Sequence, residues 1–288
     1  MRIGIAGTQT TDLVAKSIKE TLSDADFESF YFKTNSKVTM ADLVIVLGGD
    51  RGVRNYFHSA LDADTPVLGI SESESNGVLA QIELKELPSY LDRIKKQDYV
   101  IEDVPRIGVK IDGKNTYPVL NDVAVFTSKS ATLMEHILRI NGEEVWHDSS
   151  DGVIISTPIG SSAYSMSAGG PVIFQAANVF GIISVNSLDI TRRPIIVSDN
   201  SIIEIDEISS RLHCDVVLDG IDRFKINSKL EATRFTPPAR IIRMKSDSTA
   251  ISALANKVKL AEELLSMPPS SKLSVSYTHL TLPTKRIV

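Results

Sequence analysis

The segment Ala41–Asp50 reads ADLVIVLGGD and decides the fold of the N-terminal part of the chain. Its run Ala41–Leu47 is apolar at every position except Asp42, which predicts a strand buried on both faces of a sheet. Shorter apolar runs at Arg2–Ala6 and Pro66–Ile70 predict two further strands. Apolar residues at helical spacing follow each run, as expected for parallel strands joined by helices.

After about residue 100 the pattern changes to pairs of short strands around tight turns. The turn dipeptides are Asp112-Gly113, Asn141-Gly142 and Asp219-Gly220, which tolerate positive φ and favour two-residue hairpins. We expect Asp219-Gly220 to be a hairpin turn and nothing more. The sequence thus predicts a Rossmann-like α/β domain over 1–98, followed by an all-β, sandwich-like domain over 99–248.

The C-terminal part of the chain has two segments of different character. Helical spacing of Leu254, Val258, Ala261 and Leu265 predicts a helix over 249–266 that packs back on the first domain. Residues 270–288 fit no element that the fold requires. We interpret them as either a disordered tail or a cloning or sequencing artefact.

The composition is that of an ordinary globular protein. The 288 residues carry 31 Lys and Arg against 36 Asp and Glu, a net charge of −5. This mildly acidic balance argues against a nucleic-acid partner, and no apolar run reaches the roughly 18–20 residues that span a bilayer. The single cysteine, Cys214, excludes a Cys-cluster zinc site, and the five histidines show no ligand spacing. We expect a cytoplasmic protein.

The stretch Asp151–Pro171, DGVIISTPIGSSAYSMSAGGP, contains the densest chemistry in the sequence. An apolar strand leads into a loop of hydroxyls and glycines, which suit the ribose, phosphate and amide groups of a nucleotide. The stretch lacks the spacing of a nucleophile elbow and the Gly-Lys-Ser/Thr of a Walker loop. It predicts a nucleotide-binding loop; the alternative is a polar turn without a ligand.

This stretch resembles the signature of the NAD kinase family, in which a strand leads into Thr-Pro-x-Gly-Ser-x-Ala-Tyr-Ser-x-Ser-Ala-Gly-Gly-Pro. Three further marks follow in the family's order: Gly48-Gly49-Asp50, Asn121-Asp122 and Arg192-Arg193-Pro194-Ile195. The resemblance covers residues 1–266. It implies an N-terminal α/β domain that binds phosphates, a C-terminal β-rich domain that binds NAD, and a nucleotide site between them.

Asp50 follows a predicted strand, at the carboxyl end where α/β sheets place their ligands. Gly48 and Gly49 free the backbone there to wrap a phosphate. The resemblance gives Asp50 the role of the base that accepts the proton of the adenosine 2′-hydroxyl of NAD as this oxygen attacks the γ-phosphoryl group of ATP, with Mg²⁺ on the phosphates. The alternative is that Asp50 only caps the following helix.

Arg51-Gly52 departs from the family, which usually has Gly-Thr at these positions. Either the Arg51 guanidinium binds a phosphate, or it blocks the loop and weakens the use of ATP. The next loop carries Glu72 and Glu74, which either hold Mg²⁺ or, as we favour, are solvated.

Further residues are assigned to NAD by the resemblance. Asn121 and Asp122 are expected on the adenosine part, with Asp122 in place of the family's Glu; the alternative is an Asx turn. Asp151 is expected to face the nicotinamide end of NAD bound to a neighbouring subunit, which makes assembly part of the site. The signature positions expected to line the pocket are Ser162, Ala163, Tyr164 and Ser167.

The sequence therefore predicts an NAD kinase that forms NADP from NAD with ATP or polyphosphate as the phosphoryl donor. We expect a homodimer or homotetramer that requires Mg²⁺. Two alternatives remain: a non-catalytic NAD-binding protein or sensor, suggested by the altered Arg51 loop, and a lipid or other small-molecule kinase of the wider superfamily. A membrane substrate is disfavoured because the sequence has no basic amphipathic helix.

Overall fold

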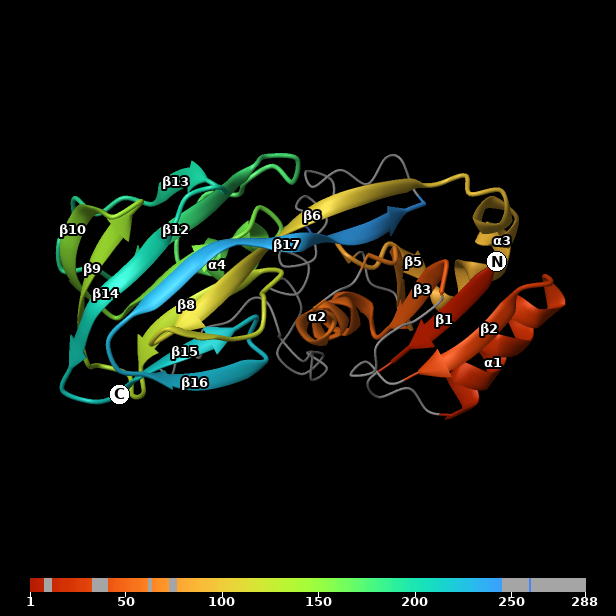
Figure 1. The fold of residues 1–288 in the computed structure, drawn as a ribbon, viewed down its shortest axis with the longest axis horizontal. Coiled ribbons are helices and arrows are strands. Elements are labelled where there is room, and N and C mark those ends of the chain that lie inside the picture. The colour runs from red at the N-terminus through yellow and green to blue at the C-terminus, as the bar shows by residue number, and fades with distance from the viewer. Residues whose placement is uncertain (8–11, 33–40, 62–63, 73–76, 245–258, 260–288) are drawn as a thin grey trace. The chain divides into compact units, whose positions relative to one another are not determined.

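The computed structural model describes residues 1–7, 12–32, 41–61, 64–72, 77–244 and 259. The chain divides into two compact units, which are described separately (Figure 1). Unit 1 is Met1–Val104 with Thr236–Asn256, and unit 2 is Pro105–Phe235 with Lys257–Val288. The long strands β6 (Val100–Ile111) and β17 (Leu230–Arg243) each contribute residues to both units. The domain bounds predicted from the sequence stay a prediction.

Unit 1 is built on a parallel sheet with helices, which confirms the α/β prediction. Its strands pair in the order β2-β1-β3-β4-β5, and the end of β17 adds a parallel pairing of Ile241 with Val67. The elements are β1 (Arg2–Ala6), α1 (Asp12–Asp24), β2 (Glu28–Phe32), β3 (Leu43–Leu47), α2 (Gly49–Ser59), β4 (Val67–Ser71), β5 (Ile82–Glu83), the 3₁₀ helix η1 (Leu84–Glu86) and α3 (Leu87–Lys95).

Strand β3 lies between β1 and β4, and all five of its residues are buried, as its sequence predicts. Alternate residues such as Leu43 and Ile45 join a core cluster that includes Ile18 and Leu22 of α1. An interior parallel strand covered on both faces has to be apolar throughout. Because β3 is fixed in this way, its carboxyl end delivers Gly48 to a defined place.

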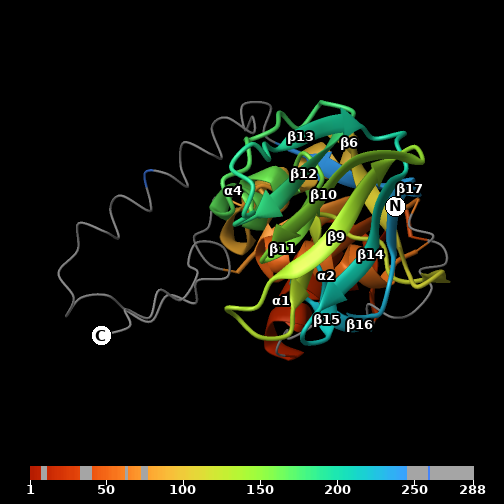
Figure 2. The ribbon, with the colours of Figure 1, turned by 90° about the vertical axis from the view of Figure 1, so that its left-hand side faces the viewer.

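Unit 2 is a sandwich of two antiparallel sheets. One has the order β10-β9-β14-β17, with β6 beside β17; the other has the order β13-β12-β11-β8-β15-β16. Figure 2 shows β9 and β14 side by side in the first sheet. A single core cluster takes Leu138 and Ile205 from one sheet and Ile155 and Phe180 from the other, so the inner faces pack together. This confirms the predicted all-β region.

The other elements of unit 2 lie between β6 and β17 in the chain. They are β7 (Lys114–Asn115), β8 (Asp122–Thr127), β9 (Met134–Ile140), β10 (Glu143–Ser150), β11 (Gly152–Ser156), the 3₁₀ helix η2 (Gly160–Ser162), α4 (Tyr164–Ser167), β12 (Val179–Val185), β13 (Ile195–Ser198), β14 (Ile203–Ser210), β15 (Cys214–Leu218) and β16 (Asp222–Ile226).

The three predicted hairpins are present as β6–β7, β9–β10 and β15–β16, although the last pairs Leu218 with Asp222 and so has a three-residue connection in place of the predicted two. Both residues of each turn dipeptide have positive φ, for example 51° at Asp219 and 66° at Gly220. The turn chemistry in the sequence therefore located these connections correctly.

Some predictions lie outside the described residues. These are the helix at 249–266, apart from Lys259, the tail at 270–288, and the side chains of Glu74 and His279. Within the described ranges, no helix has both the length and the apolar character needed to cross a membrane.

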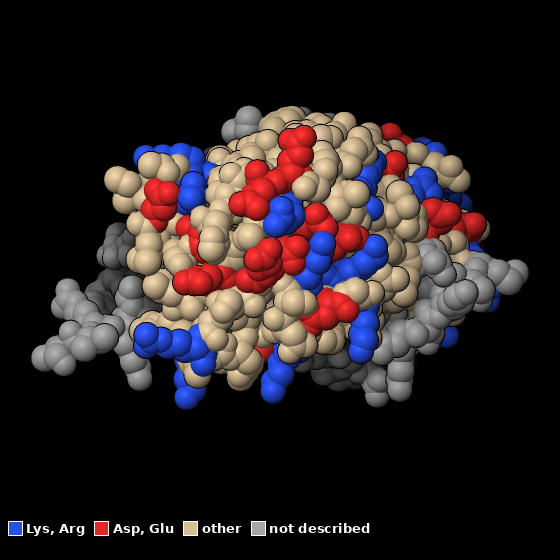
Figure 3. All heavy atoms as spheres, turned by 60° about the vertical axis from the view of Figure 1, so that its left-hand side comes forward, with Lys and Arg blue, Asp and Glu red and all other residues tan. Residues whose placement is uncertain are grey.

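Acidic and basic side chains are intermixed on the face of unit 2 that carries β9, β14 and β17 (Figure 3). Arg139 of β9 pairs with Glu144 and Asp206, and Lys229 pairs with Glu204. Ion pairs of this partly exposed kind add little to stability. They do balance one another's charge, so this face does not present the basic surface that a phosphate backbone requires.

Asp112 ties the β6–β7 hairpin to the turn that precedes β17. Its carboxylate accepts hydrogen bonds from the backbone N–H groups of Asn227, Ser228 and Lys229, and from the side chains of Asn227 and Ser228. Burial raises the pKa of this carboxyl group, but the hydrogen bonds outweigh it and lower the pKa from 3.8 to about 2.

We predict that Asp112→Ala lowers the free energy of unfolding by about 1–3 kcal/mol near neutral pH, because several hydrogen bonds to a charged group are lost. Since the folded-state pKa is lowered, the contribution is present above the ordinary pKa of 3.8 and is lost as the pH falls toward about 2. Urea unfolding should show a gap between wild type and variant that narrows over that window.

The control is Asp103→Ala, which removes a carboxylate of β6 whose ion pair with Arg240 is long, at 3.8 Å. It should change the free energy of unfolding by less than about 0.5 kcal/mol. An Asp112→Ala gap that stays constant as the pH falls would contradict the assignment.

Candidate functional site

Gly48 and Gly49 connect β3 directly to α2. Their φ angles are 95° and 64°, in the left-handed region that glycine adopts without a Cβ penalty. α2 starts at Gly49, so its unpaired N–H groups and the positive end of its dipole lie at the carboxyl end of β3. Such an end suits an anion. The contacts of Gly48 and Gly49 with a phosphate stay a prediction.

Gly52 packs closely against the end of β3. A Cβ at this position would lie 1.9 Å from the carbonyl oxygen of Leu47, so this helix geometry leaves no room for threonine. Arg51 precedes it in the first turn of α2, and its side chain is exposed. A long side chain is therefore accommodated at 51, whereas the small residue at 52 is required by close packing against β3.

The carboxylate of Asp50 binds a neighbouring loop. Oδ2 accepts a hydrogen bond from the N–H of Val78 at 2.9 Å, and Oδ1 accepts those of Leu79 and Ala80, both at 2.9 Å. The interpretation of Asp50 as a helix cap is wrong, because Gly48 is the N-cap residue and makes no side-chain cap. Asp50 instead fixes the segment Val78–Ala80 beside the start of α2.

Several hydroxyls of the signature loop in unit 2 donate to backbone carbonyls. The Thr157 hydroxyl donates to the carbonyl of Leu120 at 2.6 Å, and that of Ser161 donates to Pro158 at 2.6 Å and accepts the N–H of Ile173 at 2.8 Å. These side chains are buried. The sequence predicted hydroxyls for a ligand, but these two shape the turn that leads into η2 and α4.

Asn121 and Asp122 lie at the start of β8 and are both buried. Oδ1 of Asn121 is buried and has no hydrogen-bond partner among the described residues. Buried acceptors are nearly always paired, so an unpaired one calls for a donor from elsewhere. An Asx turn would pair this oxygen with a nearby backbone N–H group, so the Asx-turn interpretation does not account for Asn121.

Asp219 positions Asn121 and Asp122 through their backbone. Its carboxylate accepts the N–H groups of Leu120 and Asn121, each at 2.7 Å, and that of Asp122 at 3.1 Å. The sequence predicts only a hairpin turn at Asp219-Gly220. The turn is present, but the buried side chain of Asp219 also holds the segment that carries Asn121 and Asp122. No local signal in the sequence indicates this contact.

Tyr164 is partly buried beside another aromatic ring. Burial raises the pKa of its phenol, and the negative charges of Asp122 and Asp151 raise it further. Its ring centre lies 5.7 Å from that of Phe126. Asp151 also accepts a hydrogen bond from the side-chain amide of Asn186 at 2.8 Å. Tyr164 is thus held as a half-buried aromatic face.

The other predicted residues of the signature turn differ in exposure. Ala163 is buried, Ser162 is half-buried with its hydroxyl bonded to the Ile159 carbonyl, and Ser167 is exposed. Ser162, Ala163, Tyr164 and Ser167 all belong to η2, α4 or the residue that joins them. Their roles toward NAD stay predictions.

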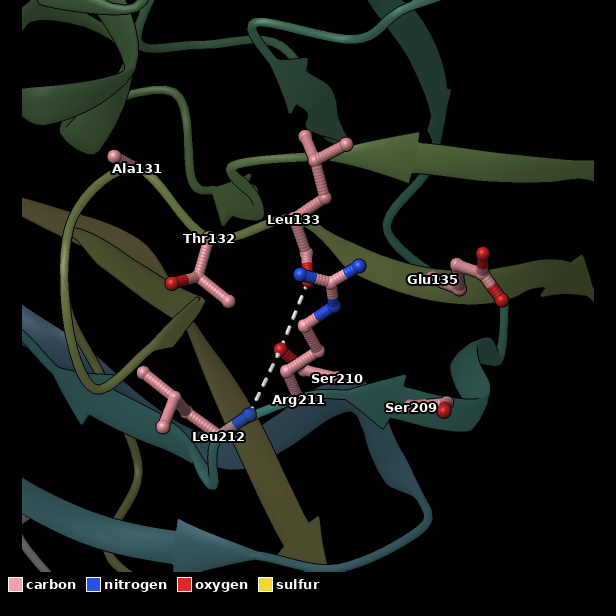
Figure 4. A pocket seen from close by; sticks show the side chains of 8 residues that line it. All are labelled: Ala131, Thr132, Leu133, Glu135, Ser209, Ser210, Arg211 and Leu212. Atoms are coloured by element: carbon pink, nitrogen blue, oxygen red, sulfur yellow. Dashed lines mark hydrogen bonds between the residues drawn. The ribbon is translucent and has the colours of Figure 1, made fainter.

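A separate hollow of about 780 Å³ lies in unit 2 between the β8–β9 connection and the end of β14 (Figure 4). Its lining includes Arg211 and Glu135 and no residue predicted for the site. The hydroxyl of Ser210 donates to the carbonyl of Leu133 at 2.8 Å and accepts the N–H of Leu212 at 3.5 Å, so it holds these loops together. This hollow and the predicted nucleotide site therefore share no residue.

Comparison with known proteins now identifies the family. A family model described as the ATP-NAD kinase C-terminal domain matches residues 120–234. The NAD kinase of Methanopyrus kandleri is 31% identical over 205 residues, which cover 71% of this chain and 74% of that protein. The chain belongs to the NAD kinase family. An NAD kinase of Clostridium perfringens is 33% identical over 228 residues, or 76% of this chain and 82% of that protein.

Solved structures of NAD kinases and related enzymes share the fold. The structure of an NAD kinase from Archaeoglobus fulgidus in complex with ATP matches with a TM-score of 0.72 at 24% identity. The match covers 91% of this chain and 99% of the Archaeoglobus chain. The structure of yeast NADH kinase complexed with NADH matches with a TM-score of 0.77 at 18% identity. The match covers 90% of this chain and 87% of the yeast chain. These matches confirm the predicted combination of an α/β unit with a β-rich unit.

We predict that Asp219→Asn loosens the segment that carries Asn121 and Asp122. The new amide group points a donor at backbone N–H donors, so hydrogen bonds to a charged acceptor are lost, and the free energy of unfolding should fall by about 1–3 kcal/mol. Hydrogen exchange measured by mass spectrometry should be faster in peptides that span 120–122.

The matched control is Lys225→Gln, which also changes one charge on the β15–β16 hairpin but alters an exposed side chain. It should leave exchange at 120–122 unchanged. Equal exchange in the wild type and Asp219→Asn would show that the carboxylate does not position this segment.

Proposed function

We propose that this protein transfers the γ-phosphoryl group of ATP to the adenosine 2′-hydroxyl of NAD, and forms NADP and ADP. Membership of the NAD kinase family supports the reaction. The observation that carries the proposal in this chain is Asn121, whose buried Oδ1 lacks a partner among the described residues, in a segment fixed by Asp219. A ligand with a hydrogen-bond donor, such as the amino group of adenine, fits this need.

We assign the adenosine part of NAD to Asn121 and Asp122, and the stacking surface to Tyr164. An amide beside a carboxylate recognises an adenine edge and ribose hydroxyls together. The half-buried phenyl ring of Tyr164, supported by Phe126, offers a face to a planar group. Ser162, Ala163 and Ser167 belong to the same turn, and we assign them to the wall of this NAD site.

We assign Asp50 as the proton acceptor. As the 2′-oxygen bonds to the γ-phosphorus, the bond to the bridging oxygen of ADP breaks and the hydroxyl proton passes to the carboxylate. Oδ1 of Asp50 already accepts two hydrogen bonds, whereas Oδ2 accepts one from the described residues. A carboxylate oxygen has about two lone-pair sites, so Oδ2 is the atom with capacity for the hydroxyl.

The divalent cation is proposed to arrive with ATP. Within the described part of the chain, no group of three or more His, Cys, Asp or Glu side chains could hold a metal ion. Mg²⁺ commonly binds substrate phosphates with few protein ligands, and it supplies charge neutralisation there. Mg²⁺ is therefore proposed as part of the co-substrate, with no cage of protein carboxylates.

The direct test is incubation of the full chain with NAD, Mg²⁺ and ATP, with NADP detected by mass spectrometry. Parallel reactions contain NADH in place of NAD, or polyphosphate in place of ATP, and one contains EDTA. NADP formation that EDTA abolishes is the expected result. Tight binding of NAD in calorimetry, with no product from any donor, would instead indicate a non-catalytic NAD-binding protein.

We predict that Asp50→Ala lowers kcat by about 100-fold or more, because general-base catalysis is worth about that factor. Calorimetric affinity for NAD should change by less than about threefold, since Asp50 is assigned only to the 2′-hydroxyl of NAD and its contribution is made mainly in the transition state. Asp64→Asn, which alters an exposed carboxylate of unit 1, is the control and should retain wild-type kcat. Near-normal turnover in Asp50→Ala would refute the role of base.

We also propose that Arg51 contacts ATP phosphates, since its guanidinium is exposed in the first turn of α2. Arg51→Ala should raise the KM for ATP about tenfold, equivalent to about 1.4 kcal/mol, with kcat little changed. Lys96→Ala removes an exposed charge at the end of α3 and should leave this KM unchanged. A lower KM in Arg51→Ala would show that the arginine obstructs ATP.

A homo-oligomer is proposed as the working form, as a homodimer or homotetramer. Several large apolar side chains of unit 2 are exposed, among them Phe174 at 52%, Leu188 at 67% and Ile190 at 85%. Exposed apolar side chains such as these are candidates for burial at an interface between subunits. Asp151 accepts a hydrogen bond from Asn186, which lies near Leu188 in the sequence. Asp151 is proposed to face the nicotinamide end of NAD bound to the neighbouring subunit.

A cytoplasmic location is also proposed, in keeping with the single, buried thiol of Cys214.

A further inference from the structure

Val78 is held on both sides of its peptide group. Its N–H donates to Oδ2 of Asp50 at 2.9 Å, and its carbonyl oxygen accepts a hydrogen bond from Nη1 of Arg243 at 2.5 Å. The next two N–H groups, of Leu79 and Ala80, also reach Asp50. The orientation of this segment therefore depends on two side chains that are far apart in the sequence, Asp50 and Arg243.

Arg243 is itself fixed in place. Its Nε donates to Oε2 of Glu102 at 2.5 Å, and its side chain is 10% exposed. Arg243 is the last residue of β17 and Glu102 belongs to β6, which pairs with β17. The planar guanidinium fork sets the angle between its two hydrogen bonds. Glu102 therefore determines where Nη1 points.

One nitrogen of the Arg243 guanidinium, Nη2, does not help to stabilise the fold. Nη2 is buried and has no hydrogen-bond partner among the described residues. A buried, unsatisfied donor destabilises a protein, and a well-packed apolar side chain often replaces a buried ion pair without loss. The presence of arginine here is better explained by what its Nη1 holds.

We propose that Arg243, oriented by Glu102, is a positioning residue for Asp50. By holding the Val78 carbonyl, it keeps the N–H groups of Val78–Ala80 directed at the Asp50 carboxylate, and these in turn orient the oxygen Oδ2. The inference rests on the proposed function, in which Oδ2 accepts the proton. It adds a residue that touches neither the substrate nor the reacting atoms.

The kinetic test compares Arg243→Met with Arg240→Met. Arg240 is a matched control, because it also lies on β17, donates to a backbone carbonyl (that of Asp64, at 2.7 Å) and faces a carboxylate of β6, Asp103. We expect Arg243→Met to lower kcat about tenfold or more with the KM for NAD within about twofold, and Arg240→Met to change neither.

The conservative variants Arg243→Lys and Glu102→Gln keep the polar character of the pair. Lysine lacks the fork that reaches both partners, so Arg243→Lys should recover only part of kcat. If Arg243→Met fails to fold, these two variants decide the matter: wild-type kcat in both would overturn the proposal.

A double variant tests whether Arg243 acts through Asp50. In the Asp50→Ala background, Arg243→Met should change the residual rate by less than about twofold, because the group it positions is absent. An equal loss of rate in both backgrounds would overturn the proposal.

Hydrogen exchange supplies a readout that does not need activity. Peptides that span 78–80 should exchange about tenfold faster or more in Arg243→Met, and at the wild-type rate in Arg240→Met. A protein that forms no NADP would contradict the proposed function but leave this measurement intact. Unchanged exchange at 78–80 in Arg243→Met would overturn the positioning role even in an active enzyme.

Discussion

The carboxylate of Asp50 accepts the N–H groups of Val78, Leu79 and Ala80, and the arrangement of unit 1 around the start of α2 depends on that contact. An ionised carboxylate needs several donors when it is drawn away from water, and consecutive backbone N–H groups supply them without a cation. These N–H groups are then occupied and cannot bind a phosphate. At this junction the unpaired N–H groups at the start of α2 remain the backbone donors that suit an anion.

The same device recurs in unit 2. Asp219 accepts the N–H groups of Leu120, Asn121 and Asp122, and Asp112 accepts those of Asn227, Ser228 and Lys229. In each case a single acidic side chain orients three peptide groups in a row. At 120–122 the backbone N–H groups are bonded to Asp219, whereas the side-chain oxygen Oδ1 of Asn121 has no hydrogen-bond partner among the described residues.

Local patterns predicted the parts of the fold that depend on local rules. The apolar run Leu43–Leu47 reports burial on both faces, and Asp219-Gly220 reports a turn with positive φ. Contacts between distant residues could not be predicted in this way. Asp219 binds groups 97 to 99 positions away, and Arg243 binds a carbonyl 165 positions away, with nothing near either residue in the sequence to indicate its partner. The hydroxyls of Thr157 and Ser161 belong to a stretch whose composition suits a nucleotide, yet they donate to the carbonyls of Leu120 and Pro158.

Gly52 couples two positions of the chain that an alignment would treat as independent. With the Leu47 carbonyl where a Cβ would be, the helix start and the strand end form one rigid unit, and any larger residue at 52 has to displace one of them. A threonine at position 52 would therefore have to displace either the first turn of α2 or the end of β3. Engineering of this loop should begin from the backbone of β3.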